Sequence, residues 1–293
     1  MRSAAACTLA VALSALVAAC AADHRPAAGS SSPGEPTVTM PQSSAPPWPA
    51  LSGLEMTPLL RDLGVVDPSV ATARQVFAMG FESDGEWGAS YVTPQSATTR
   101  HERWQQVVHS GEWAHTGWLT GEESTEPERD GPNHRGYPTL QFDRIGAGAC
   151  ASPCVVDLWV WLDANLGPGQ WFSLATLSLD PSDRWSRVIT VNVGVEGWLH
   201  LGHVPVTGAA ERAYQTDAPF PMRQWVRVTT YLDARPGGVA VVWQDGVVAS
   251  AARLDGVAGG LVPQAHFGLY APPDLLAGRV VDDDLTVWTL AGA

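Results

Sequence analysis

The chain has 293 residues and a formal net charge of −13, from 30 Asp and Glu side chains against 17 Lys and Arg. Nucleic acids and anionic lipid surfaces are recognised by basic patches, so this charge argues against both as partners. All 17 of the Lys and Arg positions are arginine, which removes lysine from any mechanism.

The first nineteen residues are typical of an export signal. Arg2 supplies a positive start, and the apolar run from Ala10 to Ala19 is too short to span a bilayer. The run ends in Leu16-Val17-Ala18-Ala19-Cys20, which resembles a bacterial lipobox and implies that Cys20 carries lipid. The alternative is an ordinary secretory signal with an incidental cysteine. In both cases we expect an exported protein, and the lipobox predicts anchoring to the bacterial cell envelope through lipid alone.

The remainder divides into three parts. Residues 20–50 are rich in Pro, Ser and Ala and predict a disordered tether, because they carry too little apolar surface to fold. Residues 51–75 predict a short helical lead-in, with helical turns at Leu54–Gly64 and Ser69–Gln75. Residues 76–293 are enough for one domain with a real core.

This last part shows short apolar runs separated by Gly, Pro, Asp and Asn, which is typical of an all-β domain. About a dozen strands in one domain predict two packed antiparallel sheets, as a sandwich or jelly roll. The predicted strands are 76–82, 103–109, 113–120, 135–143, 154–163, 171–179, 185–194, 197–204, 222–233, 238–244, 247–252, 265–271 and 280–289.

Alternation along these strands predicts an aliphatic face for the core and a second face that mixes aromatic and polar side chains. In 154–163, for example, Leu158 and Val160 oppose Trp159 and Trp161. An ordinary solvent face carries Thr, Ser and charges rather than repeated Trp. The second face is therefore predicted to be a concave ligand surface. Trp159, Trp161 and Trp198 are candidates to stack on sugar rings, with packing under a loop as the alternative.

One stretch, Gly131 to Phe142, is expected to be a turn that runs into a strand. Leu140 and Phe142 fall on one face of this strand. Arg135, Tyr137, Thr139 and Gln141 fall on the other. A cation, a phenol and an amide on one face suit a polar ligand or proton transfer.

Several motifs resemble concanavalin A-like and laminin G-like jelly rolls. They are the run Trp225–Asp233 followed by Gly238–Gly246, and Phe267-Gly268-Leu269-Tyr270 followed by Asp283–Val287. Phe81-Glu82 followed by Trp87 is similar to the opening strand of that superfamily. Within it, the chain looks most like bacterial polysaccharide-lyase-like proteins. The resemblance implies an all-β, two-sheet antiparallel jelly-roll sandwich and concerns fold more than activity.

The resemblance also implies a sugar-binding face lined with His, Tyr, Arg and Asn or Gln. Candidate positions are His134, Arg135, Tyr137, Gln141, Asn192, His200, His203, His266 and Tyr270. The chain departs from the family patterns, because it lacks the Glu-x-Asp-x-x-Glu strand of retaining glucanases and the Arg-Glu-Leu-Arg and Gln-Ile-His motifs of one alginate lyase group. That departure leaves catalysis open.

β-Elimination from a uronic acid polymer needs a group that neutralises the sugar carboxylate, a base and an acid. Arg135, with Gln141 or Asn192, is the candidate for neutralisation. His134, His200 or His203 is the candidate base, and Tyr137 or Tyr270 the candidate acid. The alternatives to these catalytic roles are structural: backbone hydrogen bonding by His134, a buried core histidine at His203 and ordinary surface positions for the others.

Two further sites are predicted from spacing. Cys150 and Cys154 are expected to form a small loop disulfide in an oxidising compartment. Glu82 and Asp284 lie in acidic stretches on strands expected to be adjacent, which suits a structural calcium ion. Solvated acidic loops are the equal alternative, and no other cofactor is expected.

The sequence therefore predicts a lipid-anchored surface protein that engages a polysaccharide. Lyase activity is the leading enzyme hypothesis. Its alternative is a non-catalytic carbohydrate-binding or surface-interaction lipoprotein on the same fold.

Overall fold

The computed structural model describes residues 51–83, 86, 91–92, 96–125, 132–142, 150–179, 187–204, 211–256 and 258–291. All of them belong to one compact unit, residues 40–293. The predicted signal, the tether and the proposed lipid site Cys20 lie outside the described residues. No described helix is both long and apolar enough to cross a bilayer.

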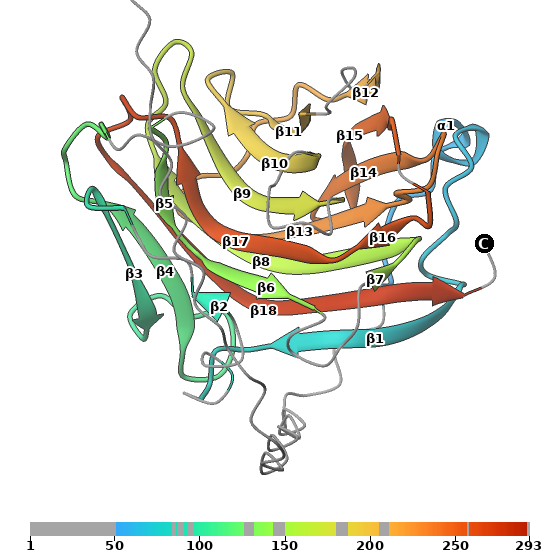
Figure 1. Ribbon diagram of the computed structural model, residues 1–293, viewed down its shortest axis with the longest axis horizontal. Coiled ribbons are helices and arrows are strands. Elements are labelled where there is room, and N and C mark those ends of the chain that lie inside the picture. Colours follow the sequence, from blue (N-terminus) through green and yellow to red (C-terminus); the bar gives the residue numbers. More distant parts are fainter. Residues whose placement is uncertain are drawn as a thin grey trace, which may run out of the picture. The chain divides into compact units, whose positions relative to one another are not determined.

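Among the described residues the larger sheet, called sheet A, has nine antiparallel strands in the order β12-β15-β14-β13-β8-β18-β4-β3, with β1 also paired to β18. Its long strands β8 and β18 run side by side and bend together (Figure 1). The strands of sheet A are β1 (Thr72–Met79), β3 (Thr99–Trp104), β4 (Ala114–Leu119), β8 (Cys154–Ala164), β12 (Glu211–Gln215), β13 (Trp225–Leu232), β14 (Val239–Gln244), β15 (Val247–Arg253) and β18 (Gly278–Ala291).

The second sheet, called sheet B, has the order β11-β10-β9-β17-β6-β2, with β5 also paired to β17. A small separate pair joins β7 (Cys150–Ala151) to β16 (Leu261–Val262). The strands of sheet B are β2 (Tyr91–Val92), β5 (His134–Gly136), β6 (Pro138–Gln141), β9 (Trp171–Ser178), β10 (Val188–Gly194), β11 (Leu199–Val204) and β17 (Gln264–Ala271).

The core between the two sheets is built by alternation. Leu158 and Val160 of sheet A and Phe267 and Leu269 of sheet B are buried in one apolar cluster. The residues between them, such as Trp159 and His266, must then point to the two outer faces, because side chains alternate along a strand. The predicted all-β, two-sheet antiparallel jelly-roll sandwich is confirmed.

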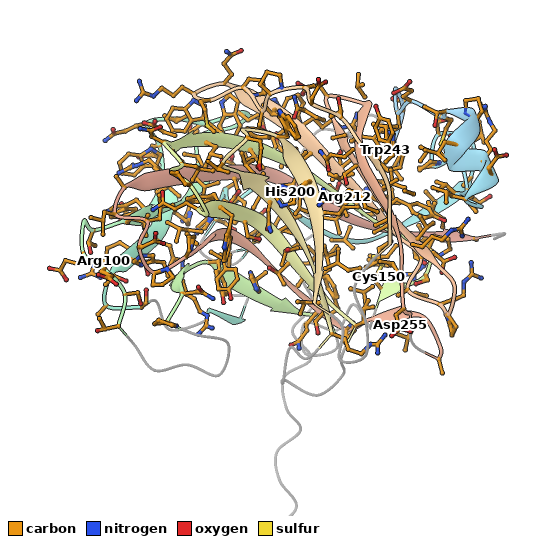
Figure 2. All side chains as sticks on the ribbon, turned by 90° about the horizontal axis from the view of Figure 1, so that it is seen from above. Arg100, Cys150, His200, Arg212, Trp243 and Asp255 are labelled. Carbon is orange, nitrogen blue, oxygen red and sulfur yellow. A yellow bond between two sulfur atoms is a disulfide. The ribbon has the colours of Figure 1, made fainter. Side chains whose placement is uncertain are left out.

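The lead-in forms a second apolar cluster on the outer face of sheet A. Helix α1 (Pro58–Asp62) starts after Thr57, whose side chain accepts a hydrogen bond from the backbone N–H of Leu60. Leu60 is fully buried in a cluster with Trp243 of β14, which lies on the α1 side of the molecule in Figure 2. Trp243 donates from Nε1 to the carbonyl of Glu55 at 2.8 Å. The lead-in therefore covers part of the outer face of sheet A, and the rest of that face is formed by the side chains of the sheet itself.

The predicted strands agree with the observed ones over most of the chain, with four differences. The helical turn predicted at Ser69–Gln75 is wrong, because β1 begins at Thr72 and pairs with β18. The strand predicted at 103–109 ends at Trp104, and the chain then forms a loop. The strand predicted at 135–143 is divided at Tyr137 into β5 and β6. The short strands β2, β7, β12 and β16 were not predicted.

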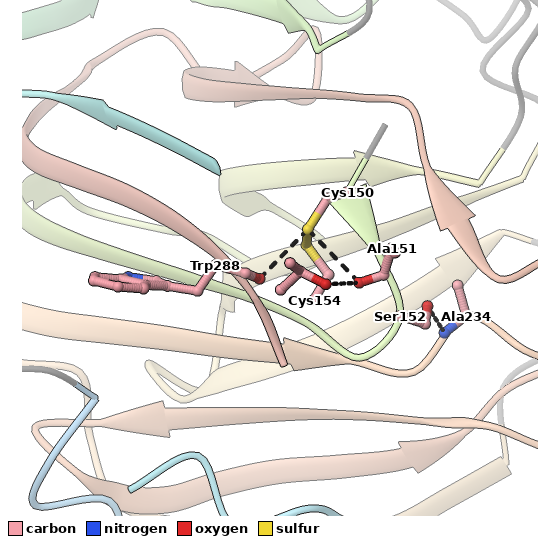
Figure 3. Close-up of a disulfide and its surroundings, with 7 residues drawn as sticks. Cys150, Ala151, Ser152, Cys154, Ala234 and Trp288 are labelled. Carbon is pink, nitrogen blue, oxygen red and sulfur yellow. Dashed lines mark hydrogen bonds between the residues drawn. A yellow bond between two sulfur atoms is a disulfide. The ribbon is translucent and has the colours of Figure 1, made fainter. Parts of the chain in front are cut away.

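The disulfide predicted between Cys150 and Cys154 is confirmed, with the two Cα atoms 5.9 Å apart (Figure 3). Neighbouring side chains fix the loop that it closes. The backbone N–H of Ala234 donates to Oγ of Ser152 at 2.8 Å, and Thr289 donates to the carbonyl of Ala151 at 2.8 Å. The disulfide thus joins the start of β8 to the small β7–β16 pair.

Candidate functional site

The outer face of sheet B, called the polar face, is built by strand register. Asn192 of β10 lies opposite His200 of β11 and Ser173 of β9. Ser173 also lies opposite Tyr270 of β17, which in turn lies opposite Arg135 of β5. Directly opposite residues have neighbouring side chains on the same face. Five strands therefore each contribute one polar or aromatic residue to a single row across the sheet.

Tyr270 is the centre of the best-defined part of this row. The Arg135 guanidinium lies 5.7 Å from the centroid of its ring. Asn133, in the turn before β5, donates from its side-chain amide to the Tyr270 hydroxyl oxygen at 2.8 Å. The Trp171 ring of β9 is tilted against Tyr270, with centroids 5.1 Å apart. Tyr270, Arg135 and Trp171 are each only partly buried, so a ligand can reach them.

Tyr137 and His266 form a stacked pair beside Tyr270. Their ring centroids are 3.8 Å apart and the rings are 9° from parallel. Both side chains are nearly buried, at 6% and 5% exposed. Burial lowers the pKa of His266 well below its ordinary value, and the charge of Arg135 lowers it further. His266 is therefore neutral at physiological pH and supports the two tyrosines rather than adding charge.

Gly268 of β17 allows this packing. Its φ of 116° lies in the left-handed region, and a Cβ there would come within 2.7 Å of Cε1 of His115 and 3.2 Å of Cβ of Tyr137. Only glycine fits between these groups without movement of one of them. Gly268 thus leaves room for both His115 and Tyr137 to pack against the backbone of β17.

His134 was predicted as a base on this face, but the structure places it elsewhere. It is fully buried. Its Nδ1 lies 2.7 Å from Oγ1 of Thr98, and its Nε2 lies 3.0 Å from the carbonyl of Pro273. The neighbouring Arg135 points outward because the two residues alternate along β5. This geometry gives His134 the backbone-anchoring role that was its alternative interpretation.

Other predicted residues lie further along the polar face. His200 is on the edge strand β11, where its Nδ1 lies 3.4 Å from the carbonyl of Trp198, and burial lowers its pKa. Figure 2 shows His200 near Arg212 of β12. Asn192 has a buried Oδ1 with no hydrogen-bond partner within the described residues. The side chains of His203 and Gln141, which belong to β11 and β6, are outside the described part of the structure.

Trp159 and Trp161 were predicted to share one ligand surface with the residues above. They lie instead on the outer face of sheet A. Their neighbours along β8, Leu158 and Val160, pack into the same core as Phe267 of sheet B. The two tryptophans and Tyr270 therefore face opposite sides of the sandwich, and the predicted single Trp-lined surface is wrong.

The predicted calcium ligands are occupied by protein groups. The Glu82 carboxylate accepts from the backbone N–H of Glu112 at 3.1 Å. The Asp284 carboxylate contacts Nδ1 of His109 at 2.5 Å and accepts from Oγ of Ser110 at 2.8 Å. Among the residues that the structure describes, no three His, Cys, Asp or Glu side chains are grouped as metal ligands. Calcium stays a prediction.

Comparison with known proteins shows the fold. No protein-family model and no curated protein matches the sequence. Among solved structures, a cellulose-induced protein, Cip1, superposes with a TM-score of 0.52 at 11% identity, over 72% of this chain and 96% of its own. An endo-β-1,4-glucuronan lyase from the fungus Trichoderma reesei gives 0.52 at 14% identity, over 74% of this chain and 96% of its own. The shared feature is the jelly-roll fold.

Sequence reasoning missed three groups on or below the polar face. Asn133 and Trp171 contact Tyr270. Alternation along 171–179 was the available signal for Trp171, because it puts this residue on the outer face when Phe172 enters the core. Inside the sandwich, Nδ1 of His115 lies 3.0 Å from Oδ2 of Asp282, and its Nε2 lies 3.4 Å from Nδ1 of His101. No sequence signal links His115, Asp282 and His101, because they come from three different strands, β4, β18 and β3.

The buried chain of His101, His115 and Asp282 predicts acid sensitivity. Burial, aided by the charge of His115, lowers the pKa of His101 from 6.5 to about 4, and burial lowers that of His115 to about 3. At these two histidines the unfolded chain therefore binds more protons than the folded protein between pH 6.5 and about 4. Burial raises the pKa of Asp282 well above its ordinary value, which acts in the opposite sense. The contribution of the two histidines to the free energy of unfolding should fall as the pH drops through this window and be fully present above 6.5.

Urea unfolding measured across this pH range tests the expectation. His101→Gln should flatten the pH dependence, because a neutral amide takes up no proton in either state. An unchanged slope in the variant would show that other groups cause the acid sensitivity.

Proposed function

We propose that the polar face of sheet B binds an acidic polysaccharide and cleaves it by β-elimination, with Tyr270 as the proton-transfer residue. The observation that carries this proposal is the grouping of Arg135, Asn133 and Trp171 around Tyr270. The glucuronan-lyase activity of one protein that shares the fold supports the choice of a uronic acid polymer. The predicted export signal and the lipobox resemblance favour action at the cell envelope.

Each group has a defined task in this proposal. Arg135 pairs with the sugar carboxylate and makes the adjacent C5 proton more acidic, because a cation stabilises the negative charge that develops there. The C5–H bond breaks, its electrons form the C4=C5 double bond, and the C4–O4 bond breaks. The Tyr270 hydroxyl oxygen takes the proton from C5 as its own hydroxyl proton passes to O4. The Asn133 amide, which donates to this oxygen, supports its orientation. Trp171 offers a ring face for the sugar.

Binding without catalysis is the second candidate function, and one observation favours it. The two histidines closest to this cluster in sequence position, His134 and His266, are both buried, at 0% and 5% exposed. Neither is placed as an exposed base beside Tyr270. If the tyrosine alone is insufficient, the same face holds an acidic glycan without cleaving it.

A panel of uronate polymers tests the proposal. Glucuronan, alginate, polygalacturonate and hyaluronan are each incubated with the purified domain, and ultraviolet absorbance reports unsaturated sugar ends. Absorbance should rise with at least one polymer and should not rise with neutral glucan. Binding measured on the same panel separates the candidates, because binding without absorbance establishes the non-catalytic function and overturns the elimination proposal.

A further inference from the structure

The outer face of sheet A carries an aromatic group that the proposed function does not use. Trp161 of β8 lies directly opposite Trp225 of β13, and Trp159 lies two residues before Trp161 on β8. All three side chains are partly buried and partly exposed. They face away from the polar face, since the core of the sandwich lies between the two sheets. We call these three tryptophans together with His109 the aromatic platform.

His109 reaches the platform from the loop between β3 and β4. Its ring stacks on Trp159 with centroids 3.9 Å apart and 17° from parallel. The His109 ring also makes a T-shaped contact with Trp225, with ring centroids 5.5 Å apart. His109 therefore adds a polar ring to a surface that is otherwise made of indoles.

Two buried aspartates fix the orientation of His109. Asp283 accepts from the backbone N–H groups of His109 and Ser110 at 2.9 and 3.2 Å. Asp284 accepts from Nδ1 of His109 at 2.5 Å, and its carboxylate is 1% exposed. This carboxylate holds the ring through Nδ1, and Nε2 has no hydrogen-bond partner within the described residues, so it is available to a ligand hydroxyl.

Two ion pairs flank the platform, and Arg279 of β18, which lies opposite Asp163, stacks over Trp104 and Trp118 instead. Arg227 and Asp157 form an ion pair at 2.9 Å, each 15% exposed. Arg223 and Asp163 form another at 2.9 Å. These pairs, together with the Asp283 and Asp284 carboxylates behind His109, leave little net positive charge to attract a polyanion. The platform therefore fits a ligand that is uncharged, rich in hydroxyl groups and flat on one side.

We propose that the aromatic platform is a second, non-catalytic binding site for a neutral polysaccharide. A pyranose ring stacks its C–H face on Trp161 and Trp225, and a neighbouring sugar hydroxyl hydrogen-bonds with Nε2 of His109. Indole rings combine a large apolar area with little conformational freedom, which suits such stacking. The site is independent of the chemistry on sheet B and retains the protein on a glycan while the polar face acts on another.

The test uses cellohexaose as a neutral probe and an oligoglucuronate of the same length as the acidic one. Binding is measured by calorimetry for the wild-type domain, Trp161→Ala, His109→Leu and Tyr270→Phe. Trp161→Ala should weaken cellohexaose binding by about tenfold or more, as expected for a central aromatic anchor. His109→Leu should weaken it about fivefold, the value of one neutral hydrogen bond. Both variants should bind oligoglucuronate as the wild type does.

Tyr270→Phe is the matched control and should leave cellohexaose binding unchanged. Thermal unfolding of each variant checks that the fold is intact. The nitrogen resonance of His109 Nε2 gives a second readout in the wild-type protein, and it should shift when cellohexaose is added. Absence of cellohexaose binding to the wild type overturns the proposal, and so does equal binding by Trp161→Ala. Either result leaves the elimination proposal unaffected, because that proposal is measured with uronate polymers.

Discussion

Replacing Tyr270 by phenylalanine should lower the rate of uronate cleavage by about 10²- to 10⁴-fold, the usual contribution of a positioned acid–base group. The ring remains, so its contacts with Trp171 and the Arg135 guanidinium should persist. The affinity for the polymer should therefore change much less than the rate. A loss that appears in kcat with little change in binding indicates an interaction made in the transition state.

Tyr214→Phe provides the matched control for this experiment. Tyr214 is 39% exposed on β12, an edge strand of sheet A, and it makes no contact with the Tyr270 cluster. Its replacement removes the same hydroxyl group from a different surface and should leave the rate unchanged. Retention of more than about a tenth of the activity by Tyr270→Phe would contradict the assigned role, given the size of the expected effect.

Replacing Trp243 by alanine should reduce the free energy of unfolding by about 3–5 kcal/mol, the range for large aromatic side chains in a core. Trp243 is fully buried between sheet A and the lead-in, and its Nε1 donates to the Glu55 carbonyl. The same segment is held by the bond from the Glu55 N–H to the Gly246 carbonyl at 2.7 Å. A cavity at Trp243 would therefore loosen the lead-in before the rest of the domain.

Guanidinium unfolding with hydrogen exchange distinguishes local from global loss. In Trp243→Ala, exchange should rise first in residues 51–66, which pack on this cluster. Trp243→Phe is the conservative control and should cost less, because it keeps a ring and loses mainly one hydrogen bond. A loss below about 1 kcal/mol in the alanine variant would show that the segment contributes little to stability.

The fold could be predicted from the sequence because the alternation of core and outward residues that marks each strand is local in the sequence. Alternation in β8, where Leu158 and Val160 enter the core, is visible in consecutive residues. The sequence did not show which of the two outer faces each outward-pointing residue occupies. Both Trp159 and Tyr270 alternate with core residues, so both are predicted to face outward, but only strand pairing shows that they belong to different sheets.

The candidate site was predictable in part for the same reason. Arg135 and Tyr137 were placed correctly on one outer face, since they alternate with buried neighbours. His134 was not, because its partners Thr98 and Pro273 are remote in the sequence. His109 was assigned to a strand that ends at Trp104, and its partners Asp283 and Asp284 lie more than 170 residues away. Ser110-Gly111, a turn signal directly after it, was the available clue.

The position of β17 and β18 has a consequence for how the protein is made. Each is an inner strand of its sheet, and each pairs with strands much earlier in the chain, β17 with β5, β6 and β9, and β18 with β1, β4 and β8. A nascent chain that lacks residues 264–291 can complete neither sheet and has no Tyr270. Such long-range pairing gives slow folding and exposes strand edges until it is finished. Tyr270 can therefore join Arg135 only once the chain has been translated through β17, so the polar face assembles after its other strands have been made.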